Sequence, residues 1–263
     1  MRLYRPVQML ATTMISSVTE HYANHLAPIY SWMVGDFDIA CSQADGFYSD
    51  ISLPDGNGSV AVDLGCGHGL HSIAIGRRGY RVLAIDTSAH LLSELNGRIG
   101  ELPIQTIDAD LTKFVDHLGS GSATLIACMG DTLTHLPSEE AVNSLIRDAA
   151  RSLVPDGWLT LSFRDYSHEL IGAERFIPVR SDDLRIHTCF LEYRTDTIVV
   201  HDIIHTRVDS AWQTSVSAYQ KLRLQPDILV AAAESNGFSL VHKQTMRGML
   251  YLAFRRTGTT IAG

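Results

Sequence analysis

One short segment constrains the fold of this chain more than any other. Residues 60–70 read VAVDLGCGHGL, an apolar run that reaches Asp63 and then places glycines at alternate positions. An apolar, β-branched run of this length is typical of a buried parallel strand, and glycines are needed where the backbone turns sharply and a ligand approaches the main chain. A helix expected over residues 71–78 would direct its free amides and positive end towards negative charge on that ligand. The segment therefore predicts the first strand of an α/β domain followed by a cofactor loop.

The spacing of the glycines bears on which nucleotide the loop holds. A dinucleotide fingerprint reads G-x-G-x-x-G, whereas here Gly65 and Gly67 are followed by Gly69, and Leu70 occupies the position of the third glycine. A nicotinamide dinucleotide is therefore the second choice, and an NAD-linked dehydrogenase stays open as an alternative.

Acidic residues follow the next two expected strands. The second strand, residues 80–85, ends at Asp86, about 20 residues beyond the loop, where a carboxylate is placed to accept hydrogen bonds from vicinal ribose hydroxyls. The third strand, residues 102–107, is followed by Asp108 and Asp110. Either carboxylate can accept a hydrogen bond from an exocyclic adenine amine, and we favour Asp110.

Polar residues also follow the fourth and fifth expected strands. Asp131 comes just after residues 123–129, and Arg164 comes directly after residues 158–163. Because ligands of open α/β sheets bind beyond the carboxyl ends of the strands, Asp131 is a candidate to reach the reacting centre. His135 lies in the same segment and is a weaker candidate for a base. Polar groups at successive strand ends are harder to explain by chance than any one of them.

The composition limits the class of partner. With a net charge of -8 and a pI near 5.8, the chain lacks the basic face that binding to a nucleic-acid backbone requires. No apolar run approaches the ~18 residues of a membrane span, and residues 1–20 lack the order of a signal peptide. The four cysteines are scattered without a C-x-x-C pair, which suits reduced thiols. We therefore expect a cytoplasmic protein with a small-molecule partner and no nucleic-acid or membrane partner.

The periodicity changes in the last third of the chain. Residues 185–193, 197–207 and 212–224 alternate apolar and polar side chains between turn residues, which predicts a three-stranded antiparallel meander. A helix over 226–236 and two further strands are expected to complete the main sheet. We expect an N-terminal helical cap over 1–58, a core over 59–175 with 226–263, and an inserted meander over 176–225 that serves as a substrate lid or a contact in a homo-oligomer.

These segments resemble the class I S-adenosylmethionine-dependent methyltransferases of small molecules, and within them the glycine and sarcosine N-methyltransferases. The pattern D-x-G-x-G that begins at Asp63 is similar to the methionine-binding loop of that family. Residues 128–137 resemble its L-G-N-S-F-x-H-L-P stretch, and Phe163–Tyr166 resembles its H-R-N-Y. The resemblance implies a Rossmann-like, doubly wound sheet of seven strands and the cofactor S-adenosylmethionine, with S-adenosylhomocysteine as product.

The resemblance also implies roles for individual residues. The cofactor contacts fall on the aromatic N-terminal segment, the glycine loop and the strand ends: Tyr22, Tyr30, Asp63, Gly65, Cys66, Gly67, Asp86, Thr87, Asp110, Leu111 and Met129. The expected catalytic and acceptor-binding residues are Asp131, His135, Arg164 and Tyr166. Asp131 stands where the family has asparagine, which favours a cationic or proton-losing acceptor.

Methyl transfer from a sulfonium needs little covalent chemistry from the protein, because orientation alone can account for about 7–11 kcal/mol of the barrier. We expect transfer to an amine or another heteroatom of a small, carboxylate-bearing metabolite. Arg164 would pair bidentately with that carboxylate, and Asp131 would orient the nucleophile or take its proton. The alternatives are an enzyme that transfers or cyclises the aminocarboxypropyl arm of the same cofactor and a cofactor-binding protein without catalysis.

The twelve histidines raise the question of a metal. His201 and His205 are expected on one face of a strand with His187 across from them, but no tight ligand spacing accompanies the three. We therefore expect no metal site.

Overall fold

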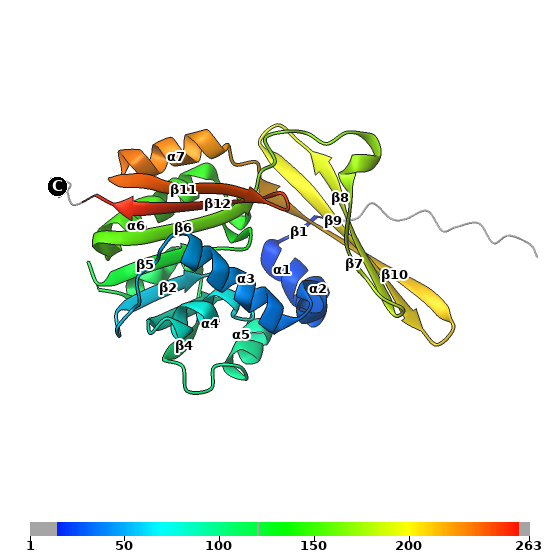
Figure 1. Cartoon of the computed structure of the whole chain (residues 1–263). Helices are drawn as coiled ribbons and strands as arrows, with labels where there is room; N and C mark the ends of the chain where they lie inside the picture. Colours follow the sequence, from blue (N-terminus) through cyan, green and yellow to red (C-terminus); the bar gives the residue numbers. More distant parts are fainter. Residues whose placement is uncertain (1–14, 120, 258–263) are drawn as a thin grey trace, which may run out of the picture.

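The computed structural model describes residues 15–119 and 121–257. Residues 1–14 of the expected helical cap and residues 258–263 of the expected core lie outside the described part. Figure 1 shows a large sheet with helices on both faces and a second sheet that projects from one end of it. No helix among the described residues is long and apolar enough to cross a membrane.

The large sheet has seven strands in the order β11-β12-β6-β5-β2-β3-β4. Its parallel part is formed by β2 (Val60–Leu64), β3 (Arg81–Asp86), β4 (Ile104–Asp108), β5 (Ala123–Cys128) and β6 (Leu153–Arg164). The hairpin of β11 (Phe238–Met246) and β12 (Met249–Arg256) adds to β6 in the antiparallel direction. The α/β fold expected from the sequence is confirmed.

Alternate residues of the buried strands supply two hydrophobic layers, one on each face of the sheet. Leu125 and Ala127 of β5 join the layer beneath α3 (Phe37–Asp50), α4 (Leu70–Arg77) and α5 (Ala89–Asn96). Ile126 and Cys128 join the layer beneath α6 (Glu139–Ser152) and α7 (Pro226–Ser235). Parallel strands that are covered on both faces have to be apolar on both, which is why these strands read as continuous apolar runs.

Strand β6 begins earlier than the sequence suggests. The segment 155–157 was expected to be a turn that precedes the strand, but it lies inside β6, because Leu153 already pairs with Ala123. The pairing of β6 with β5 shifts its register between Ala123 and Leu125 of β5. Asp156 of β6 has a positive φ of 60°. The irregularity is thus absorbed within the strand, as in a β-bulge.

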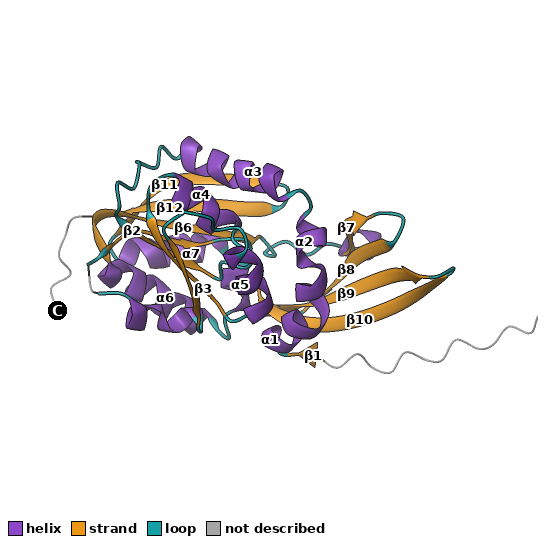
Figure 2. Cartoon of the chain, turned by 90° about the horizontal axis from the view of Figure 1, so that it is seen from below, coloured by secondary structure: helices purple, strands orange, loops and turns teal. Residues whose placement is uncertain are grey.

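The N-terminal segment lies between the large sheet and the second sheet (Figure 2). It runs through β1 (Ile15–Ser16), α1 (Val18–His21), a π-helical turn (Tyr22–Leu26), a 3-10 turn (Ala27–Ile29) and α2 (Tyr30–Val34). This part of the expected N-terminal helical cap consists of short helical pieces, and Ser17 caps the first through a capping box with Glu20.

The second sheet has five strands in the order β1-β10-β9-β8-β7. The three expected strands are β8 (Arg185–Tyr193), β9 (Thr197–Val208) and β10 (Ala211–Leu222), which pair antiparallel. Two more strands join them, β7 (Phe176–Ser181) at one edge and β1 of the N-terminal segment at the other. A two-residue strand far away in the sequence carries no periodic signal of its own, so β1 could not be foreseen.

The register of β8 with β9 corrects the expected placement of the histidines. His187 pairs across the strands with Ile204, whereas His201 pairs with Phe190 and His205 pairs with Ile186. Because side chains alternate between the faces of a strand, His187 lies on the face opposite to His201 and His205. The three histidines therefore cannot form one cluster.

Candidate functional site

A cavity of about 330 Å³ opens at the carboxyl ends of the parallel strands. It is bounded by the glycine loop, by the segments that follow β3, β4 and β5, and by the N-terminal segment. The expected site residues that line it are Tyr22, Tyr30, Gly65, Cys66, Gly67, Asp86, Thr87, Asp110, Leu111, Met129 and His135. Four expected site residues do not line it, namely Asp63, Asp131, Arg164 and Tyr166.

The glycine loop needs its glycines for two different reasons. Gly65 and Gly67 both have positive φ, of 69° and 54°, which side chains rarely adopt. A Cβ at Gly65 would in addition collide with the side chain of Thr132, whereas a Cβ at Gly67 would make ordinary contacts with Tyr30 at 3.9 Å and Leu91 at 4.0 Å. Gly65 is therefore fixed by packing against the segment after β5, and Gly67 by its backbone conformation alone.

Asp86 links the end of β3 to the glycine loop. Its Oδ2 accepts a hydrogen bond from the amide of Gly67 at 2.8 Å, and its Oδ1 accepts one from the amide of Ser88, also at 2.8 Å. Burial raises the pKa of Asp86 above its usual value, against the opposing effect of these amide donors. Each oxygen keeps further lone-pair capacity for hydroxyl donors from the cavity.

Asp63 lies behind the loop rather than in the cavity. It is 1% exposed, and its Oδ2 accepts a hydrogen bond from the hydroxyl of Ser72 on α4 at 2.6 Å. Burial raises the pKa of Asp63 to about 7, although the Ser72 hydroxyl acts in the opposite direction. This hydrogen bond links the end of β2 to α4, the helix that follows the loop.

Two more wall segments come from the ends of β4 and β5. Of the two candidate acids after β4, Asp110 lines the cavity and Asp108 does not. The Oδ1 of Asp110 caps the following 3-10 helix by accepting from the amide and the hydroxyl of Thr112. Leu111 and Met129 add apolar surface, so this end of the cavity suits a flat ring with polar edges.

The aromatic N-terminal segment forms the opposite wall. The rings of Tyr22 and Tyr30 lie 6.2 Å apart, and Tyr30 meets the buried His68 edge to face at 5.0 Å. Burial, followed by the nearby Asp86 carboxylate, raises the pKa of Tyr30 to about 12. The phenol is therefore neutral and can donate a hydrogen bond at physiological pH.

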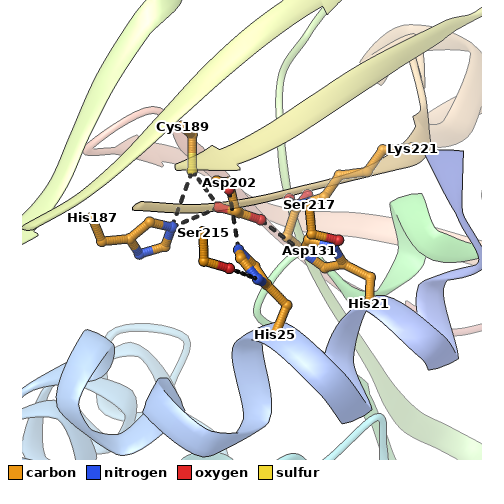
Figure 3. Close-up of polar contacts among 9 residues, drawn as sticks. All are labelled: His21, His25, Asp131, His187, Cys189, Asp202, Ser215, Ser217 and Lys221. Carbon is orange, nitrogen blue, oxygen red and sulfur yellow. Dashed lines mark hydrogen bonds and ion pairs between the residues drawn. The ribbon is translucent and has the colours of Figure 1, made fainter. Parts of the chain in front are cut away.

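Asp131 is committed to a buried ion pair with a residue of the second sheet (Figure 3). Its Oδ2 accepts from the Nζ of Lys221 at 2.6 Å, while its Oδ1 accepts from the amide of Arg164 at 2.9 Å and the hydroxyl of Thr134 at 3.1 Å. Burial acts to raise the pKa of Asp131, but the Lys221 ammonium outweighs it and the pKa lies below the usual value. The carboxylate is thus ionised and fully engaged by protein groups.

His135 lies at the junction of this ion pair and the cavity. Its ring approaches Tyr22 at 5.5 Å and Tyr219 at 5.7 Å. Its Nε2 is buried and has no hydrogen-bond partner among the described residues. Burial, and then the Lys221 ammonium, lowers the pKa of His135 to about 3, so the imidazole is neutral. An unpartnered ring nitrogen on a cavity-lining residue suits a polar group of a bound molecule.

The expected carboxylate-binding arginine lies elsewhere. The side chain of Arg164 is exposed, beside the turn between β11 and β12, where a Cβ at Gly248 would lie 3.4 Å from its Nη1. Its backbone pairs with Met249 of β12. Tyr166 is buried in the small core of the second sheet with Leu191 and Ile198. Tyr166 therefore contributes to packing and Arg164 lies at the surface, and neither side chain lines the cavity.

Sequence reasoning missed several residues of the site and its surroundings. These are Lys221, which pairs with Asp131, and the lining residues Val18, Thr19, Ser88, Leu91, Gly130 and Thr132. Lys221 could have been flagged as a lysine on the buried face of an alternating strand, next to the buried Leu222 and two positions from the buried Tyr219. Its partner could not have been named, because the pairing joins two different sheets.

Comparison with known sequences finds similarity to methyltransferases. Residues 61–157 match a family model described as a methyltransferase domain. Glycine/sarcosine N-methyltransferase of Halorhodospira halochloris is 26% identical over 150 residues, or 56% of this chain and 55% of the relative. A ubiquinone biosynthesis O-methyltransferase of Azoarcus sp. (strain BH72) is 31% identical over 124 residues, or 44% of this chain and 51% of the relative. The chain thus spans about half the length of the curated relatives it matches.

Solved structures share the fold over most of the chain. The methyltransferase CcbJ from Streptomyces caelestis superposes with a TM-score of 0.71 at 17% identity, covering 90% of this chain and 98% of that one. CalS10, an amino pentose methyltransferase from Micromonospora echinaspora with bound S-adenosylmethionine, gives a TM-score of 0.67 at 15% identity, covering 94% and 100%. At such identities the likeness concerns the fold.

Proposed function

We propose that the chain transfers a methyl group from S-adenosylmethionine to an amine or another heteroatom of a small polar molecule, because residues 61–157 match a methyltransferase domain. The observation that carries the proposal is the cavity at the strand ends, where Asp86, Asp110 and the glycine loop face one enclosed space. When bound, the cofactor supplies an electrophilic methyl group on a sulfonium centre.

The wall chemistry fits this cofactor from one end to the other. The Asp86 carboxylate has lone-pair capacity for two ribose hydroxyls, and Leu111 with Met129 offers apolar surface to an adenine ring. Asp110 lies at the same end as a hydrogen-bond acceptor for an exocyclic amine. Gly67 lines the cavity without a side chain, which would let the methionine part approach the backbone. These residues bind and orient, which is the main task in such a transfer.

Among the lining residues, we assign contact with the attacking group of the acceptor to His135. With its proton on Nδ1, the neutral ring presents Nε2 as a hydrogen-bond acceptor to the N–H or O–H of the attacking group. The Asp131–Lys221 pair stands behind this position and is not available to the acceptor, since both groups are paired with each other. His135 therefore orients the nucleophile in place of Asp131.

The carboxylate that we expected on the acceptor would have no lysine or arginine partner among the described residues of the cavity wall. None of the described lining residues is a lysine or an arginine, and Arg164 faces solvent. We therefore propose an acceptor that need not carry a carboxylate. Similarity to glycine/sarcosine N-methyltransferases, and to the fold of an amino pentose methyltransferase, favours nitrogen as the methylated atom.

The proposal is tested in two stages with the full chain. Calorimetric titration with S-adenosylmethionine and S-adenosylhomocysteine should show saturable binding, and both should raise the melting temperature. Incubation with a panel of amino acids, amino sugars, simple amines and small phenols should then yield S-adenosylhomocysteine and a product heavier by one methylene unit. NAD should give no stabilisation.

The products separate the alternatives. Formation of methylthioadenosine would indicate transfer or cyclisation of the aminocarboxypropyl arm and would contradict methyl transfer. Tight cofactor binding without turnover of any acceptor in a broad panel would support a cofactor-binding protein without catalysis.

A further inference from the structure

A second cluster of polar side chains lies on the face of the small sheet that points to the N-terminal segment (Figure 3). His187 and Cys189 are two positions apart on β8 and so share a face. Asp202 on β9 is the cross-strand partner of Cys189. The ladder of paired strands therefore fixes all three side chains on one surface.

The three side chains converge on a single point. The Oδ1 of Asp202 lies 2.6 Å from the Nε2 of His187 and 2.9 Å from the Sγ of Cys189, and the sulfur lies 3.8 Å from the same nitrogen. All three ligand atoms lie within 4.8 Å of one another. His187 and Asp202 are 1% and 2% exposed and Cys189 is partly exposed, so two of the three groups are shielded from bulk water.

The carboxylate of Asp202 is held from the other side by the N-terminal segment. Its Oδ2 accepts from the Nε2 of His21 at 2.8 Å, and the Nδ1 of His21 bonds to the hydroxyl of Ser217 on β10 at 2.8 Å. The ring of His21 stacks on Tyr219 at 4.1 Å. Outer contacts of this kind, which fix the orientation of a carboxylate, are typical of the surroundings of metal ligands.

We propose that His187 Nε2, Cys189 Sγ and Asp202 Oδ1 bind a zinc ion. Zn²⁺ accepts nitrogen, thiolate and carboxylate ligands together, whereas the soft thiolate disfavours Mg²⁺ and Ca²⁺. A thiolate and a carboxylate balance the two positive charges of the ion, so the loaded site is neutral, as its burial requires. The fourth position of the tetrahedron is left to a water molecule or to an exogenous ligand.

The distances fit a site that widens slightly on loading. Tetrahedral zinc at bond lengths of about 2.0–2.3 Å separates its ligand atoms by about 3.3–3.6 Å. The sulfur and the His187 nitrogen, at 3.8 Å, lie slightly beyond that spacing, while the two contacts with Asp202 Oδ1 are shorter than it. Small shifts of the side chains are sufficient, because the strand register already sets the positions of the three Cα atoms.

The ion would have a structural consequence beyond the small sheet. It would join β8 to β9 and, through the Asp202–His21 contact, fix the segment that carries Tyr22 onto the cavity. This inference does not depend on methyl transfer, because its ligands are separate from the residues that line the cavity. It reverses the expectation of no metal, which rested on spacing along the chain rather than across two strands.

The test uses the full chain without an affinity tag, stripped with a chelator and then reloaded. Elemental analysis after loading with zinc and gel filtration should give one zinc per chain. Loading with Co²⁺ should give a thiolate-to-cobalt charge-transfer band in the near ultraviolet. Cys189→Ser keeps a hydroxyl donor to Asp202 and so preserves the fold, yet it should abolish the band and weaken zinc binding at least about 10-fold.

Two further variants and two controls complete the design. Asp202→Asn should also lose the metal, and His21→Asn should weaken binding by about 10- to 100-fold without removing a ligand. His201→Gln on the opposite face and Cys41→Ser in the main core should bind zinc as the original chain does. A cobalt complex without the thiolate band, or equal zinc contents in the original chain and Cys189→Ser, would overturn the site and leave a cluster held by hydrogen bonds alone.

Discussion

The Nζ of Lys221 lies 2.6 Å from the Oδ2 of Asp131, and both side chains are buried, at 8% and 5% exposure. Asp131 follows β5 of the large sheet and Lys221 belongs to β10 of the second sheet. The pair is therefore the polar link between the two sheets at the inner end of the cavity.

Removal of one partner of this ion pair should be costly. Lys221→Met leaves an uncompensated carboxylate in a buried position and should lower the free energy of unfolding by about 3–5 kcal/mol. Asp131→Asn combined with Lys221→Met removes both charges and should recover most of that loss, because asparagine tolerates the left-handed backbone at this position. Urea denaturation of the single and double variants measures both values. A loss below about 1 kcal/mol in Lys221→Met would indicate a solvated pair.

Asp86 should contribute strongly to cofactor affinity. Asp86→Asn keeps the size of the side chain but loses the charge and one acceptor for the Gly67 and Ser88 amides. Hydrogen bonds to a charged group are worth about 1.5–3 kcal/mol, so the dissociation constant for S-adenosylmethionine should rise by about 10- to 150-fold. Asp108→Asn is the matched control, since Asp108 is the cross-strand partner of Asp86 but lies outside the cavity wall. Calorimetric titration compares the two, and equal affinities would contradict the role.

Gly65→Ala should disturb the cofactor loop more than a comparable glycine change elsewhere. Gly58→Ala is the control, because Gly58 also has a positive φ, of 81°, but has open space where the methyl would lie. Gly58→Ala should lower the free energy of unfolding by about 1–2 kcal/mol, through backbone strain alone. Gly65→Ala also pushes against Thr132 and should cost about 1–3 kcal/mol more, together with a loss of cofactor affinity. Equal unfolding free energies for the two variants would show that the loop shifts to accommodate the added methyl group without a measurable cost.

Asp63 should make folding stability fall as the pH rises. Its pKa is raised by burial to about 7 in the folded chain, against an ordinary value of 3.8, so the folded state holds its proton more tightly. This contribution is fully present below about pH 4 and is lost as the pH rises through 7, with a slope of at most about 1.4 kcal/mol per pH unit. Asp63→Asn should remove this slope. Denaturation at several pH values between 5 and 8 gives the free energy of unfolding of both forms. Parallel pH dependences in the two forms would contradict the role of Asp63.

His135 should matter for turnover rather than for cofactor binding. His135→Phe keeps an aromatic ring beside Tyr22 but removes Nε2, and should lower kcat by about 100-fold if this nitrogen holds the proton of the nucleophile. The affinity for S-adenosylhomocysteine should change little. Because the pKa of His135 lies near 3, its titration should not appear in the rate profile between pH 5 and pH 9. Steady-state kinetics with any acceptor found in the panel provides the measurement.

The convergence of Asp86, Asp110 and the glycine loop on one cavity was accessible from the sequence for a geometric reason. Carboxyl ends of parallel strands meet at one edge of the sheet, so Asp86, Asp110 and the glycine loop converge once their strands are recognised. Each of these groups lies within a few residues of a strong apolar run, and strand assignment alone places them. The same argument gave the α/β fold.

The acceptor side was not accessible in the same way. Arg164 ends a strand as expected, but β12 pairs beside it and the Arg164 side chain turns to solvent near Gly248. Lys221 and the His187–Cys189–Asp202 cluster depend on which strands pair, on their register, and on how the second sheet sits against the first. Those relationships join residues distant in sequence, and no local pattern encodes them.

The pairing of β12 with β6 has a consequence for synthesis of the chain. One edge of β6 meets β5, while its other edge waits for Met249–Arg255, and residues 165–248 leave the ribosome in between. During that interval the apolar edge of β6 offers unpaired backbone groups to any neighbouring strand. The second sheet and α7 are therefore synthesised before β12 can complete the main sheet, and an unpaired strand edge of this kind is prone to aggregation during folding.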